Sequence, residues 1–125
     1  MIDFKNGKVI KLKATGKFNS EKTLAPILVL GEEVIGEFQG VRDYVVFTNK
    51  RVIAVNTQGV TGKKKDVTSL PYNKIQLFSF ETSGLVDMDS ELELYFSGVG
   101  AIRFEFASSK ELVTITRAIS GYVLT

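Results

Sequence analysis

Residues 91–106 read ELELYFSGVGAIRFEF, and the pattern of this stretch decides the fold. On both sides of the central Ser-Gly-Val-Gly sequence, apolar residues alternate with charged or polar ones. Leu92 and Leu94 therefore share one face of the first half, and Glu91 and Glu93 share the other. A strand with one buried face requires this period of two. We predict an antiparallel hairpin that turns at residues 97–100 and buries one face in a hydrophobic core.

The segment after this hairpin has the features of a helix. Residues 108–111, SSKE, match a capping box, in which the serine hydroxyl and the glutamate carboxylate bond each other's backbone amides. Leu112, Ile115, Ile119 and Tyr122 then recur at spacings of three and four residues, which is typical of an amphipathic helix. We predict that this helix covers the open end of the sheet and buries its apolar stripe there.

Five more runs rich in β-branched and aromatic residues come before the hairpin, at residues 33–39, 44–49, 51–56, 66–70 and 75–82. Residues 9–12, which are interleaved with lysines, are compatible with an edge strand. A short helix is compatible with the stretch that begins near Ser20. The predicted class is mainly β, with about seven strands in two nearly orthogonal antiparallel sheets capped by a C-terminal α-helix.

Composition excludes several classes of function. The chain has 125 residues, 44% of them hydrophobic, which suits a single domain with one packed core. It has no Cys and no His, which removes disulfides, Cys/His zinc sites, haem ligation by His and thiol nucleophiles. We therefore expect no enzyme activity and no cofactor. A net charge of +2 does not by itself indicate a nucleic-acid partner. No apolar run reaches the roughly 18–20 residues of a membrane-spanning helix, so we expect a cytoplasmic protein.

Six motifs occur in order along the chain: LGEE at 30–33, RDYVVFTNKR at 42–51, QGVTGKK at 58–64, LPY at 70–72, FETSG at 80–84 and DMDSEL at 87–92. Together they resemble the bacterial pleckstrin-homology (PH) domain family over residues 24–124. The resemblance implies a PH-like fold in a bacterial protein. It also implies ring-like homo-oligomers of pentameric form, and no established ligand. We predict one domain over residues 1–125, with a PH-like core at 24–124 and an N-terminal extension at 1–23.

Charged residues near strand ends suggest how such subunits contact one another. We expect a basic set to reach an acidic set on the neighbouring subunit, because a head-to-tail contact joins two different patches. The alternative is ordinary exposed charge, which contributes about 0–1 kcal/mol per pair. The basic set is Arg42, Lys50 and Arg51, and the acidic set is Glu81, Asp87, Asp89 and Glu91.

The segment from Gly59 to Lys65 carries three consecutive lysines, Lys63, Lys64 and Lys65. It does not match a phosphate-binding loop, which needs four residues between its glycines and a Ser or Thr after the lysine. One interpretation is a hairpin turn whose glycines take positive φ. The other is a basic tip that meets an anionic surface.

Two more patterns are interpreted as structural. Residues 87–91 lack the glycine and glutamate positions of a calcium-binding loop, so we expect no metal site there. Phe104 and Phe106 share a face with Ile102, which favours core packing over a nucleic-acid stacking platform.

Two hypotheses follow. The first is a homo-oligomer or protein-interaction module that uses sheet edges such as 51–56 or 66–70 together with charge contacts. The second is an adaptor for anionic lipid that uses Lys63–Lys65.

Overall fold

The computed structural model describes residues 9–14, 21–40, 43–82, 89–107 and 112–124. The described residues contain one curled eight-stranded sheet with the order β5-β4-β3-β2-β1-β8-β7-β6. The strands are β1 (Val9–Ala14), β2 (Val34–Gln39), β3 (Asp43–Thr48), β4 (Arg51–Gln58), β5 (Lys64–Pro71), β6 (Ile75–Thr82), β7 (Ser90–Phe96) and β8 (Gly100–Phe106). The helices are α1 (Glu21–Leu24), α2 (Leu112–Val123) and two 3-10 turns, η1 (Ala25–Ile27) and η2 (Tyr72–Lys74).

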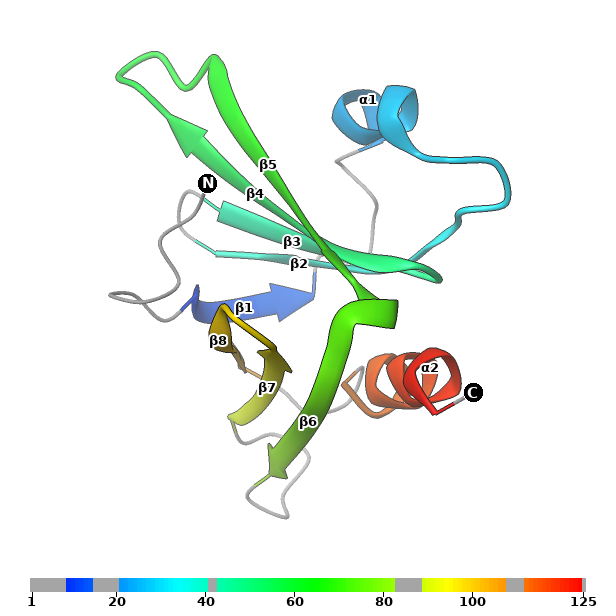
Figure 1. The fold of residues 1–125 in the computed structure, drawn as a ribbon. Coiled ribbons are helices and arrows are strands. Elements are labelled where there is room, and N and C mark those ends of the chain that lie inside the picture. Colours follow the sequence, from blue (N-terminus) through cyan, green and yellow to red (C-terminus); the bar gives the residue numbers. More distant parts are fainter. Residues whose placement is uncertain (1–8, 15–20, 41–42, 83–88, 108–111, 125) are drawn as a thin grey trace.

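The two halves of the sheet cross each other, and each half has its own helix. Figure 1 shows β2–β5 in the upper half beside α1 and β6–β8 in the lower half beside α2. This arrangement confirms the predicted PH-like class, in which a mainly β shell is capped by a C-terminal helix.

The predicted hairpin at 91–106 is confirmed as β7 and β8. Leu92 lies opposite Phe104 and Leu94 opposite Ile102, and these four side chains are buried. Gly98 has a φ of 83° and Gly100 a φ of 108°, the left-handed region in which glycine carries no Cβ penalty. The alternation of apolar with charged or polar residues in the sequence therefore corresponds to the buried and outer faces of the hairpin.

The predicted C-terminal helix is confirmed as α2, although its stripe is only partly buried. Leu112, Ile115 and Ile119 are at most 1% exposed and belong to the main core cluster. The prediction that Tyr122 shares this burial is wrong, because Tyr122 is 44% exposed near the end of the helix. The predicted capping box at 108–111 lies outside the described residues.

The first strand, β1, is not an edge strand, and this prediction is wrong. It lies between β2 and β8, antiparallel to β2 and parallel to β8, and so joins the two halves of the sheet. Leu12 explains this position, because its side chain is 1% exposed and lies in the main core. The lysines on either side of Leu12 in the sequence made β1 resemble an edge.

The edges of the described sheet are β5 and β6. The expectation that residues 66–70 form an edge is confirmed. The expectation that residues 51–56 form one is wrong, because β4 pairs with β3 on one side and β5 on the other.

The core has two parts, one on each face of the upper half of the sheet. The main cluster contains Phe38, Phe47, Phe104 and Phe106, whose rings pack edge-on or tilted at centroid distances of 4.8–6.2 Å. The predicted core role of Phe104 and Phe106 is therefore confirmed. The second cluster places Leu24 of α1 on Val46, Ile53 and Val55.

Gly36 of β2 lies against the buried face of α2. A Cβ built on Gly36 would lie 2.9 Å from Cδ1 of Ile115. We expect Gly36→Ala to lower the free energy of unfolding by about 1–3 kcal/mol, since it overpacks a buried contact. Ile115→Val removes the clashing Cδ1, so the double variant should lose less than the sum of the two single losses.

Gly121→Ala is the matched control for this prediction. A Cβ at Gly121 has no neighbour within 4 Å, so this change should raise helix stability. Urea denaturation measures all four variants, and an unchanged Gly36→Ala protein would contradict the close packing.

Candidate functional site

A buried ion pair organises one end of the molecule. Arg51 Nε lies 2.9 Å from Glu32 Oε2, and Arg51 Nη2 donates to Glu32 Oε1 at 3.1 Å. The Glu32 side chain is 0% exposed and that of Arg51 is 19% exposed. The Thr48 hydroxyl donates to Oε2 at 2.7 Å and the Val29 amide to Oε1 at 3.0 Å. The carboxylate thus accepts four hydrogen bonds, which compensates its removal from water.

Two further N–H groups of Arg51 tie three segments together. Nη1 donates to Ser69 Oγ of β5 and Nη2 to the carbonyl of Ile27, each at 2.9 Å. Arg51 therefore makes its contacts within its own subunit. We do not propose that it binds the acidic set of a neighbouring subunit. Its partner in the fold is Glu32, which the interface hypothesis did not include.

The turn between β3 and β4 is held against the same end. Asn49 accepts from the amide of Glu33 through Oδ1 at 2.8 Å and donates from Nδ2 to the carbonyl of Gly31 at 2.9 Å. The Tyr72 hydroxyl donates to the carbonyl of Thr48 at 2.7 Å, and burial raises the pKa of this phenol. The segment at 31–33, the turn and η2 therefore form one hydrogen-bonded unit.

Burial and hydrogen bonding act on Glu32 in opposite directions. Burial raises the pKa of the carboxyl, while hydrogen bonds from Arg51, Val29 and Thr48 lower it, and the net effect lowers the pKa below its usual value. The charged form is therefore the one that the fold stabilises.

The outer face of the lower half of the sheet carries a row of acidic residues. Glu91 of β7 lies opposite Glu81 of β6 on one side and Glu105 of β8 on the other. Arg103 Nε donates to Glu93 at 3.0 Å and lies 3.7 Å from Glu91. Directly opposed like charges destabilise a sheet, and Arg103 offsets part of the repulsion between the glutamates of this row.

The structure brings only part of the predicted interface set together. Glu81 and Glu91 face each other, and exposed Asp89 comes directly before β7. Lys50 is exposed in the turn between β3 and β4, on the other half of the sheet. Arg42 and Asp87 lie outside the described residues.

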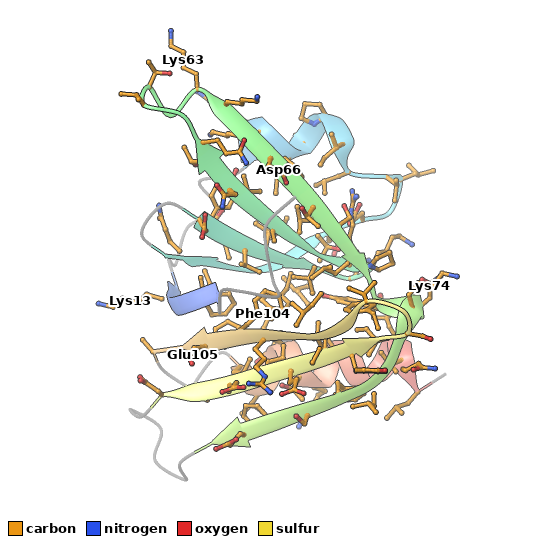
Figure 2. All side chains as sticks on the ribbon, turned by 60° about the vertical axis from the view of Figure 1, so that its left-hand side comes forward. Lys13, Lys63, Asp66, Lys74, Phe104 and Glu105 are labelled. Carbon is orange, nitrogen blue, oxygen red and sulfur yellow. The ribbon has the colours of Figure 1, made fainter. Side chains whose placement is uncertain are left out.

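The three predicted tip lysines lie at the far end of the β4–β5 hairpin and are exposed. Figure 2 shows Lys63 at the end of this hairpin, remote from Glu105 on the lower half. Gly59 and Gly62 have φ of 80° and 68°, and the Gly62 amide donates to the Gly59 carbonyl, as expected of a glycine turn. Val60 is fully exposed at the same tip.

Within the described ranges, no three acidic side chains are grouped to hold a metal ion. No helix in the same ranges has the length and apolar character needed to cross a bilayer.

The curled, mainly β sheet with its C-terminal helix defines a PH-like domain, and comparison with known proteins identifies its family. The bacterial PH domain profile matches residues 3–123, so the chain belongs to this family.

Relatives and solved structures agree with this assignment. The chain is 42% identical over 103 residues to the uncharacterized protein YjqA of Bacillus subtilis, covering 81% of this chain and 82% of that one. A DUF1696-family protein with a PH domain from Shewanella loihica has a TM-score of 0.74 and 35% identity, covering 93% of this chain and 98% of that one. A PH domain from Shewanella amazonensis has a TM-score of 0.61 and 41% identity, covering 84% and 86% respectively.

Removing Arg51 should leave the Glu32 carboxylate buried without its cation. We expect Arg51→Ala to lower the free energy of unfolding by about 3 kcal/mol, the lower end of the range for breaking a buried pair because Arg51 is partly exposed. Arg103→Ala removes a half-exposed arginine paired with Glu93 and should cost about 0–1 kcal/mol. Equal losses by urea denaturation would contradict the role assigned to Arg51.

The lowered pKa of Glu32 makes a prediction about pH. The unfolded chain takes up the proton first, so the stabilisation by Glu32 is present above its unfolded pKa of about 4.3 and is lost as pH falls through the lower folded value. The stability difference between wild type and Glu32→Gln should therefore shrink from pH 7 to pH 3. A difference that stays constant or grows on acidification would contradict this sign.

Proposed function

We propose that this PH-like domain is a non-catalytic assembly module whose subunits join head to tail through the two sheet edges. The observation that carries the proposal is that β5 and β6 are the edges of the described sheet and that their ends carry opposite charges. Each strand is eight residues long, so each offers a comparable row of backbone groups for β-augmentation.

Charge complementarity selects an antiparallel pairing of β5 with the β6 of a neighbour. In that orientation the basic start of β5, Lys64–Lys65, meets the acidic end of β6 at Glu81. Glu81 has no ion-pair partner among the described residues. A lysine from the neighbour would also approach Glu91, which lies on the adjacent strand β7. It would reduce the repulsion between Glu81 and Glu91.

The faces of the two strands restrict the register. On β5, Val67 and Ser69 lie opposite Val55 and Ile53, so they share the face that carries the α1 cluster. On β6, Phe78 and Phe80 pack against the main core, which leaves Leu77 on the outer face and 56% exposed. When Lys65 pairs with Glu81, the outer face of β5 and the outer face of the neighbour's β6 lie on the same side of the joined sheet. Ser69 then lies opposite Leu77.

Such a contact joins two different patches, so it generates a ring when the rotation between subunits closes. The proposed form is a pentameric ring, as the family resemblance implies. Lys50, Asp89 and Glu91 remain candidate interface charges, as do Arg42 and Asp87 outside the described residues. The proposed location is the bacterial cytoplasm, and a second protein is a further possible partner.

A second candidate function, adaptor to an anionic lipid surface, is favoured by one observation. Val60 is fully exposed beside Lys63, Lys64 and Lys65, so the hairpin tip combines an apolar residue with positive charge. At about 1 kcal/mol per lysine one tip binds weakly, and a ring would add avidity. Protein that floats with phosphatidylserine liposomes, and fails to after Lys63→Glu, would support this role.

Solution mass tests the assembly. We expect wild type at about 0.1 mM to exceed the 13.8 kDa monomer severalfold by light scattering, at a concentration where micromolar contacts are saturated. Lys65→Glu and Glu81→Lys should each lower the mass, because each places like charges together. The combined swap should restore it.

Arg117→Glu, an exposed change on α2, is the matched control and should leave the mass unchanged. A monomeric wild type, or a swap that restores nothing, would contradict the proposed edge pairing.

A further inference from the structure

A pocket of about 380 Å³ opens beside the buried ion pair. It lies where the β3–β4 turn, the end of β5 and the last turn of α2 meet. Figure 1 shows the end of α2 close to the corner between β5 and β6. Neither the sheet-edge pairing nor the hairpin tip uses this pocket.

The walls of the pocket are apolar and partly aromatic. They include Val29, Pro71, Tyr72 and Tyr122. The rings of Tyr72 and Tyr122 are tilted by 35° with centroids 5.9 Å apart, and Tyr72 is fixed by its hydroxyl bond to the β3–β4 turn. Val29 is 55% and Tyr122 44% exposed, so both present apolar surface that a ligand would cover.

The floor of the pocket is electrically neutral. Glu32 lines it, but its carboxylate already accepts four hydrogen bonds, two of them from Arg51. Arg51 has five N–H groups, and its four hydrogen bonds leave one Nη1 hydrogen over. An acidic ligand would therefore meet no unpaired carboxylate at the floor.

The rim of the pocket is positive. Lys50 lines it, is exposed, and has no ion-pair partner among the described residues. One free ammonium beside apolar walls matches one negative charge attached to an apolar group. The volume lies near the lower end of the roughly 300–1,000 Å³ range of small-ligand pockets, which suits a single ring with a short substituent.

We propose that this pocket binds a carboxylate attached to an aromatic group. The carboxylate contacts Lys50 and the remaining Arg51 hydrogen, while the ring packs on Tyr122 and Val29. Two sources have this chemistry, namely a free aromatic acid and the C-terminal aromatic residue of a peptide.

Three probes separate these sources and test the charge. Phenylacetate represents the free acid, and N-acetyl-L-phenylalanine represents a peptide C-terminus. N-acetyl-L-phenylalaninamide has the same structure with an uncharged amide in place of the carboxylate. We expect both acids to shift the backbone amide signals of Val29, Lys50, Asn73 and Tyr122 in ¹⁵N-labelled protein. The uncharged amide should bind at least about tenfold more weakly. Tighter binding of N-acetyl-L-phenylalanine supports the peptide source, and tighter binding of phenylacetate the free acid.

Two variants locate the contact. Lys50→Gln should weaken both acids at least fivefold, and Tyr122→Ala should weaken the acids and the amide probe alike. Lys74→Gln removes a nearby exposed charge that does not line the pocket and should leave binding unchanged. The proposal is overturned by absent shifts at about 10 mM probe, by equal binding of acid and amide, or by equal effects of Lys50→Gln and Lys74→Gln.

Discussion

The carboxylate of Glu32 is buried completely, and its need for a cation constrains this whole end of the protein. Arg51 supplies that cation and at the same time bonds Ile27 and Ser69. One guanidinium thereby holds the segment that enters β2, the start of β4 and the last part of β5 in fixed relation. The β5 edge and the floor of the pocket both depend on this arrangement, so structure and proposed binding share one physical origin.

Local periodicity predicted most of the fold because most strands pair with their neighbours in sequence. Alternation at residues 91–106 and the stripe of Leu112, Ile115 and Ile119 follow directly from which faces are buried. The position of β1 could not be predicted in this way. Its parallel partner, β8, lies about 95 residues further along the chain, and no local pattern specifies such a pairing. Pairing on both sides and the burial of Leu12 distinguish β1 from an edge strand, and neither can be seen in the local sequence pattern.

The same limit applies to the charged residues. Exposure of Lys63–Lys65 was predictable, because these lysines occupy a glycine turn and the start of the strand that follows it. The inward pairing of Arg51 was not, since its partner Glu32 is nineteen residues away and only the fold brings them together. Glu32 stands within the family motif at 30–33, and that was the one available signal. The opposed glutamates of β6 and β7 likewise became apparent only once their register was known.

Edge pairing of β5 with a neighbour's β6 is the central claim, and cysteine cross-linking tests it most directly. The chain has no native Cys, so any disulfide reports an introduced pair. In the proposed register Val67 lies opposite Ser79 of the next subunit. Oxidised Val67→Cys/Ser79→Cys protein should give a ladder on a non-reducing gel that ends at a covalent pentamer, and the single variants should not. A double variant that stays monomeric, or stops at dimer like the single variants, would contradict head-to-tail assembly through these edges.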